Sequence, residues 1–403
     1  MGALREFNGN THFMSVARHG GYVYFSETTF NGLFRYKEGE NEAEFLGRFP
    51  NEDLWQGDLH REVFVKGDKL YFIPMNGHGI TVYDCVDGTF EMLKILGKEE
   101  EYVHFAQCVK LENEILLIPV DYGTPFTLFN IETEEIRTLP EIFEKIAKNI
   151  PLPVRYEVFP VHSTVLKDDI LYLSVSSTNI LLKLSLADYK VEKIVLPFEI
   201  HLRYMSFFDG VFYFTAQEHL IASWKEADNT GQIYEMPGEA EDPNYPYLKI
   251  ERYNNNLYVI AGREDHFWKF NPTTGEWQDL LKKAPEEFER DLKGPLLFLG
   301  YSINKNILKL YPRAGNGFLT FDIEKGAFEF KQYLYDAKAG EELSKDWVKT
   351  ILDGGRLFIE YDLRPTDYIT YINENSGDNK VESNYEPAGE VIYQRILSEV
   401  TGA

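Results

Sequence analysis

Short apolar segments separated by polar turns follow one another along the chain, and apolar and polar residues alternate within them. The clearest form is a segment ending in Asp or Asn, a turn rich in Gly, Thr or acidic residues, and a second alternating segment. It occurs at 80–91, 126–136, 267–277 and 318–328. Alternation with a period of two predicts half-buried β-strands, and Asp, Asn and Gly suit hairpin turns because they tolerate positive φ. The pattern predicts a series of β-hairpins.

These hairpins belong to longer units of four predicted strands. The second strands align on one residue each: Tyr24, Tyr71, Leu117, Tyr172, Tyr213, Tyr258, Lys309 and Phe358. Most of these positions are roughly 40 to 50 residues apart, a repeat typical of four-stranded propeller blades. We therefore predict an all-β fold, a β-propeller of antiparallel blades that forms one domain over 1–403. Eight units are counted, and because the eighth, 347–382, shows the weakest pattern, seven blades is the alternative.

Three segments between units have helical rather than strand spacing: 139–147, 285–292 and 337–348. The first opens with Pro140 and Glu141, a proline and an acidic residue as helix starts favour. We expect short helical insertions at these places.

The segment 270–277 reads Phe-Asn-Pro-Thr-Thr-Gly-Glu-Trp, and with this motif the sequence resembles the kelch-type propellers. It departs from the family where kelch repeats carry a Gly-Gly doublet, since 259–262 reads Val-Ile-Ala-Gly. The chain also resembles uncharacterised propeller proteins of anaerobic bacteria. Kelch-like folds bind proteins, bind sugars or catalyse reactions, so the resemblance leaves the function open.

The amino-acid composition limits the classes of binding partner that this protein can have. With 41 Lys and Arg against 65 Asp and Glu, the formal charge is 41 − 65 = −24, which disfavours nucleic acid and anionic membranes as partners. Two cysteines, Cys85 and Cys108, are too few for a disulfide framework. No apolar run is long enough for a signal core or a membrane span. We expect an acidic cytoplasmic protein.

In a propeller, the start of each first strand and the loop between second and third strands share one face and converge on a central funnel. Eight of the nine histidines fall in these two positions. The candidate ligand-binding residues there are Arg61, His78, Gln107, His162, His201, Arg203, Tyr204, Arg263, His266 and Arg313. Arginine suits a carboxylate or a phosphate because its planar guanidinium binds both oxygens of such a group.

His60 and His104 are the candidates for a catalytic or metal-binding role. Both precede a valine by five residues, which predicts that they share a phase and reach one ligand or one divalent metal ion. The opposing interpretation is that imidazoles near strand ends bond neighbouring backbone groups.

Three functions remain open at this point. The first is binding of a small polar or anionic ligand, such as a carbohydrate, in the funnel. The second is an enzyme, a metal-dependent lyase, hydrolase or epimerase acting on a carbohydrate. The third is a scaffold with a protein partner, as the kelch resemblance implies. The sequence does not decide among them, nor does it give the ligand or the oligomeric state.

Overall fold

The structure is a computed structural model that describes residues 13–96, 101–150, 161–216, 219–238, 247–261, 266–288, 298–312, 317–340 and 342. All of them belong to one compact unit, Gly9–Leu357. A second unit, Met1–Asn8 with Phe358–Ala403, lies outside the described residues, and so does the predicted eighth repeat unit. A single domain over 1–403 therefore stays a prediction.

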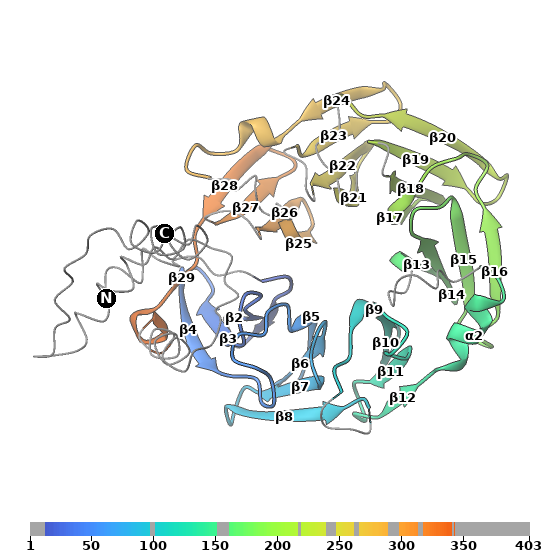
Figure 1. The fold of residues 1–403 in the computed structure, drawn as a ribbon. Coiled ribbons are helices and arrows are strands. Elements are labelled where there is room, and N and C mark those ends of the chain that lie inside the picture. Colours follow the sequence, from blue (N-terminus) through green and yellow to red (C-terminus); the bar gives the residue numbers. More distant parts are fainter. Residues whose placement is uncertain are drawn as a thin grey trace, which may run out of the picture. The chain divides into compact units, whose positions relative to one another are not determined.

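Seven antiparallel sheets of four consecutive strands follow one another around a ring (Figure 1). We call them blades 1 to 7 in chain order. In each blade the first strand lies nearest the centre of the ring and the fourth lies at its outer edge. The predicted propeller of four-stranded blades is confirmed, with seven blades.

The first four blades contain the following strands. Blade 1 has β1 (Ala17–His19), β2 (Tyr22–Ser26), β3 (Leu33–Lys37) and β4 (Glu42–Gly47); blade 2 has β5 (His60–Lys66), β6 (Lys69–Pro74), β7 (Gly79–Asp84) and β8 (Thr89–Lys94). Blade 3 has β9 (Phe105–Lys110), β10 (Glu114–Pro119), β11 (Thr127–Asn130) and β12 (Ile136–Thr138); blade 4 has β13 (Val161–Lys167), β14 (Ile170–Val175), β15 (Ile180–Ser185) and β16 (Val191–Val195).

The last three blades follow the same order. Blade 5 has β17 (Leu202–Phe208), β18 (Val211–Ala216), β19 (Leu220–Lys225) and β20 (Thr230–Glu235). Blade 6 has β21 (Tyr247–Tyr253), β22 (Asn256–Ala261), β23 (Trp268–Asn271) and β24 (Glu276–Asp279); blade 7 has β25 (Phe298–Asn304), β26 (Ile307–Pro312), β27 (Phe318–Asp322) and β28 (Ala327–Lys331).

One of the three helical insertions forms largely as predicted. Helix α2 (Glu141–Ala147) carries acidic residues in its first turn and buries Ile142 and Ile146, which lie one turn apart against blades 3 and 4. The helix predicted at 285–292 is wrong in its described part, because 285–288 form a turn after a short 3-10 helix, η1 (Leu281–Lys283). Residues 337–340 and 342 are helical, in agreement with the third prediction.

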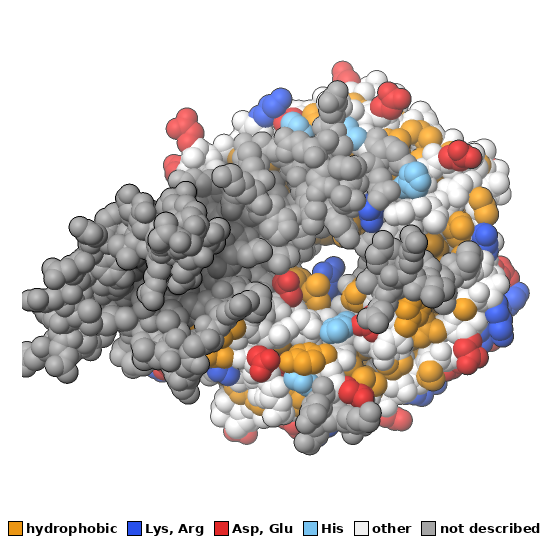
Figure 2. Space-filling model, viewed as in Figure 1, with side chains coloured by type: hydrophobic (Ala, Val, Ile, Leu, Met, Phe, Trp, Pro, Cys, Tyr) orange, Lys and Arg blue, Asp and Glu red, His pale blue; other side chains and the backbone are white. Residues whose placement is uncertain are grey.

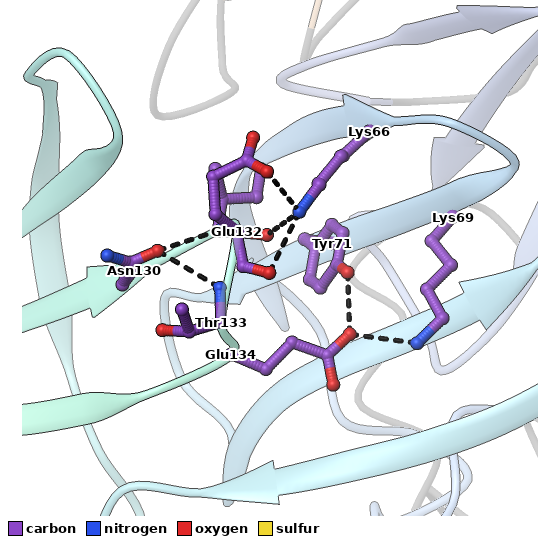
Figure 3. A network of polar contacts seen from close by, with 8 residues as sticks. Lys66, Lys69, Tyr71, Asn130, Glu132, Thr133 and Glu134 are labelled. Atoms are coloured by element: carbon purple, nitrogen blue, oxygen red, sulfur yellow. Dashed lines mark hydrogen bonds and ion pairs between the residues drawn. The ribbon is translucent and has the colours of Figure 1, made fainter.

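Neighbouring blades are joined by polar contacts as well as by apolar packing. The Oη of Tyr71 in β6 and the Nζ of Lys69 donate hydrogen bonds of 2.7 and 2.8 Å to Oε1 of Glu134, in the turn between the last two strands of blade 3 (Figure 3). Beside them, Nζ of Lys66 lies 2.7 Å from a carboxylate oxygen of Glu132. The acidic turn that recurs in the sequence therefore links blades 2 and 3 through hydrogen bonds and an ion pair.

The same arrangement links blades 4 and 5. Glu226, in the turn after β19, accepts a hydrogen bond of 2.6 Å from Oη of Tyr172. Lys167 and Lys183 bind the same carboxylate at 2.9 and 2.6 Å. Tyr71 and Tyr172 are two of the residues on which the sequence repeat was aligned, so the repeat includes this contact.

The ring closes through a strand that follows blade 7. Strand β29 (Leu334–Tyr335) pairs in parallel with the outer edge of β4, with Leu334 opposite Glu42. On the other side of this junction, the ring of Phe13 stacks on Phe318 of blade 7, with centroids 4.6 Å apart. Segments from both ends of the described chain thus hold blades 1 and 7 together.

Candidate functional site

The first strands share an irregularity that shapes the centre of the ring. In six of them, β5, β9, β13, β17, β21 and β25, the register with the second strand shifts by one residue just after the first pair. A bulge of this kind redirects the side chains beside it. Arg61, His162 and Arg203, all predicted as ligand-binding, lie within this shift in blades 2, 4 and 5.

The strand pairing also shows that the common phase predicted for His60 and His104 is wrong. His60 pairs with Pro74 at the end of β6, and the residue that pairs with the equivalent Pro119 of β10 is Phe105. His104 therefore stands one residue earlier than His60. A shift of one residue turns a side chain to the opposite face of a strand.

His60 lies in the core between blades 1 and 2. Its side chain is buried, its Nδ1 is 2.8 Å from Oγ of Ser26, and its ring contacts those of Phe49 and Phe72. Burial lowers the pKa of His60 to about 3, so the imidazole is neutral at ordinary pH. Such a residue fits a structural role better than the catalytic or metal-binding role that we expected.

His104 is held by the loop between β10 and β11. Its Nδ1 donates a hydrogen bond of 2.5 Å to Oδ2 of Asp121, and its backbone N–H donates to Oγ1 of Thr124. The other oxygen of Asp121 accepts the N–H of Thr124 at 2.8 Å. Because the carboxylate can only accept, Nδ1 carries the proton and Nε2 of the neutral ring has a lone pair. The side chain is 38% exposed, so this orientation prepares it to act as a base.

His78 is held in a similar way by Glu52. Its Nδ1 lies 2.9 Å from Oε2, while its backbone N–H donates to Oε1 of the same carboxylate. The rings of His78 and Tyr102 are 4.0 Å apart, and a β-bridge joins Gly77 to Val103. The bridge places the His78 loop of blade 2 beside the chain that leads to His104. Burial raises the pKa of Glu52, against the lowering effect of the hydrogen bonds from His78.

The other predicted residues lie at separate positions around the ring. Oε1 of Gln107 accepts a hydrogen bond of 2.7 Å from Thr164 of blade 4. The buried Arg203 donates to Oγ of Ser176, and the N–H of Tyr204 donates to Thr215.

His201 is exposed, and His266 bonds Oδ2 of Asp279 and contacts the ring of Trp268. The side chain of His162 and all of Arg263 and Arg313 lie outside the described residues. Figure 2 shows histidine side chains exposed on several blades of the face in view.

Apart from Arg61, the sequence reasoning missed a group of ionisable side chains on the first strands. We call it the channel cluster, and its members are Arg61 and Glu62 of β5, Cys108 of β9, Lys249 and Glu251 of β21, and Tyr301 of β25. Lys249 interacts electrostatically with Glu62, although blades 6 and 2 are not neighbours in the ring. The two side chains therefore approach each other across the centre, where Figure 2 shows an opening with acidic and basic side chains at its edge.

The pKa values of several residues in the channel cluster are shifted by burial. Burial raises the pKa of Glu62 to about 7, although Arg61 and Lys249 act to lower it. Burial lowers the pKa of Lys249 and raises that of the Cys108 thiol. The Oη of Tyr301 donates a hydrogen bond of 2.6 Å to Glu251. Groups with pKa values displaced by burial inside a concave site mark candidate binding and catalytic residues.

Glu62 and Lys249 have no hydrogen-bonding partner of their own within the described part of the chain, unlike Glu251. A signal for them existed in the sequence, because each is a charged residue at the third position of a first strand. Their approach across the ring, however, depends on the closed fold.

Metal binding has no support in the described ranges. Among these residues, no group of three or more His, Cys, Asp or Glu side chains is arranged to hold a metal ion. No helix in the described ranges is long and apolar enough to cross a membrane.

Comparisons with known proteins support the propeller fold. The sequence matches no protein-family model and no curated protein. Among solved structures, the extracellular domain of the putative one component system BT4673 from B. thetaiotaomicron has a TM-score of 0.54 at 11% identity. That match covers 81% of this chain and 43% of the other.

Virginiamycin B lyase from Staphylococcus aureus matches with a TM-score of 0.52 at 11% identity, covering 76% of this chain and 94% of the lyase. A streptogramin B lyase has a TM-score of 0.52 at 12% identity, covering 80% and 95%. At such identities the likeness shows the fold alone. These structures are propellers, and no kelch-type family is shown among them.

Proposed function

We propose that this propeller binds a small polar ligand, of the carbohydrate class, in its central channel. The observation that carries the proposal is the pair Glu62 and Lys249. Both residues lie on first strands, at the centre of the ring, and they interact electrostatically with each other. Neither side chain has a hydrogen-bonding partner within the described part of the chain. Charged groups taken out of bulk water need partners, and a polar ligand supplies them.

The test is a binding screen. Purified protein is titrated calorimetrically with neutral and acidic mono- and oligosaccharides, and the best ligand is then measured against Glu62→Ala. Glu235→Ala, on an exposed outer strand, is the matched control. We expect binding to the wild type and the control and weaker binding to Glu62→Ala. If no saccharide binds, or if Glu62→Ala binds as well as the control, the proposal is wrong.

The second candidate, an enzyme acting on the same ligand, is favoured by the pair His104 and Asp121. A histidine oriented by a carboxylate, with a lone pair on its outer nitrogen, is suited to general-base catalysis. In this candidate, the base acts on the ligand directly or through water. Turnover of a bound saccharide that is lost in His104→Ala and reduced in Asp121→Asn would support this candidate.

The third candidate is a scaffold with a protein partner, which rests on the kelch resemblance at 270–277. It becomes the preferred function if neither binding nor turnover of saccharides is found. The cytoplasmic location expected from the sequence also stays a proposal. The free thiols of Cys85 and Cys108 are compatible with it.

A further inference from the structure

The two cations of the channel cluster are poorly partnered. In the described part of the chain, the hydrogen bond of the Arg61 guanidinium goes to Sδ of Met14, at 3.8 Å. A thioether is a weak acceptor, whereas a guanidinium offers five N–H donors. Lys249, which interacts electrostatically with Arg61, has no hydrogen bond to a described residue. Two basic side chains on the first strands therefore keep most of their hydrogen-bond donors available.

The carboxyl groups nearby do not offset these cations fully. Glu251 is engaged by Tyr301. Burial raises the pKa of Glu62 to about 7, so near neutral pH this carboxyl carries only part of its negative charge. Arg61 stays protonated throughout. Burial also lowers the pKa of Lys249, so Arg61 is the permanent positive charge of the channel cluster, in a protein whose formal charge is −24.

We propose that the ligand carries an anionic group, a carboxylate or a phosphate, that binds between Arg61 and Lys249 while its hydroxyl groups face Glu62. This inference rests on the proposed function and specifies its ligand as an acidic sugar. Arginine binds both oxygens of such an anion, and lysine adds a compact charge. Charge-assisted hydrogen bonds of this kind provide much of the affinity for small anions.

The experiment compares three probes of similar size, D-glucose, D-glucuronate and D-glucose 6-phosphate, by calorimetry. The variants are Lys249→Met and Arg61→Met, with Lys193→Met on the exposed strand β16 as the matched control. Melting temperatures establish that each variant is folded. We expect one of the two acidic probes to bind more tightly than glucose, and each channel variant to weaken that binding by about tenfold to a hundredfold.

A pH series provides a second readout. Glu62 is surrounded by Arg61, Lys249, Cys108 and Tyr301, and its own negative charge repels a bound anion. Anion binding should therefore strengthen as pH falls from 8 to 6, because Glu62 takes up a proton in this interval. In Glu62→Gln, which cannot ionise, this dependence should flatten.

The outcomes separate the two proposals. Tighter binding of glucuronate identifies the anion as a carboxylate, and tighter binding of the sugar phosphate identifies it as a phosphate; either supports the inference. If glucose binds as tightly as both acids and Lys249→Met has no effect, the anion site is wrong while the proposed function stands. If none of the saccharides binds, both are overturned.

Discussion

Tyr335 donates a hydrogen bond of 2.8 Å from its Oη to Oε2 of Glu27, a residue 308 positions earlier in the chain. Both side chains are buried, and the second oxygen of Glu27 accepts the N–H groups of Thr28 and Thr29. The contact fastens β29 to the loop that follows β2. It joins the last described strand to the first blade through a carboxylate that water does not reach.

Removing this hydroxyl should weaken the closure of the ring. We expect Tyr335→Phe to lower the free energy of unfolding by about 1.5 to 3 kcal/mol, because a hydrogen bond to a buried carboxylate is lost. Urea denaturation measures the change. Tyr253→Phe, which removes a bond to the exposed Glu324, is the control and should change little. Equal stability of Tyr335→Phe and wild type would show that the closure does not depend on this bond.

The hydrogen bonds of Glu226 should make the free energy of unfolding depend on pH in the acidic range. Although burial acts to raise it, hydrogen bonds from Lys183, Tyr172 and Lys167 lower the pKa of Glu226 to about 2. In an unfolded chain the pKa is about 4.3, so the stabilisation is present above this value and is lost as pH falls from about 4.5 to 2.

We expect Glu226→Gln to be less stable than wild type by about 1 to 3 kcal/mol at pH 7, and the difference to vanish near pH 2. Denaturant unfolding at a series of pH values measures both. Glu192→Gln, at an exposed ion pair with Lys190, is the control. A difference that stays constant from pH 7 to 2 would contradict this account.

His60 should lower the stability of the fold over a different pH range. Its pKa is lowered by burial to about 3, whereas an unfolded histidine has a pKa of about 6.5. Only the unfolded state takes up this proton as pH falls from about 6.5 to 3, so stability decreases over that interval. We expect His60→Leu to show a shallower decrease, measured by unfolding at pH 7, 5.5 and 4.5.

The truncation His60→Ala should lower the free energy of unfolding by roughly 3 kcal/mol, because it opens a cavity between Phe49 and Phe72. Saccharide binding at the channel should be unchanged in this variant if it stays folded. Loss of binding without loss of stability would return His60 to the candidate ligand groups.

The charge of the chain predicts weak interaction with polyanions. With a formal charge of −24, we expect no binding of duplex DNA or of anionic vesicles at physiological salt. Binding to a polyanion is favoured when basic side chains displace the cations around its phosphates, and an acidic protein does not do this. Fluorescence anisotropy with labelled DNA and sedimentation with vesicles measure this. Micromolar DNA affinity that falls as salt increases would refute the prediction.

The blades could be predicted from the sequence because their signals are local. Seven of the eight aligned residues, from Tyr24 to Lys309, lie in second strands. The site is harder to predict because its geometry depends on the exact register of each first strand, and an error of one residue reverses the face on which a side chain lies. Counting from Val65 and Val109 placed His60 and His104 in one phase. The two valines are not equivalent, however, because Val65 pairs one residue nearer the start of its second strand, with Leu70, than Val109 does with Leu116.

Interactions between blades on opposite sides of the ring are also difficult to predict from the sequence. Glu62 and Lys249 interact electrostatically only because blades 2 and 6 face each other in a closed ring, and no local pattern in the sequence encodes this arrangement. Arg61, by contrast, was found from the sequence, since its place at the start of a first strand is a local property. Its proximity to Lys249 was not.

The parallel pairing of Leu334 with Glu42 has a consequence for synthesis of the protein. Blade 1 leaves the ribosome first, but the strand that covers its outer edge is translated only after all seven blades. Until then, the backbone groups of β4 that await β29 are open to any other extended chain, including another nascent copy. Protein made under conditions that slow or stop translation near residue 335 should therefore be the form most prone to aggregate.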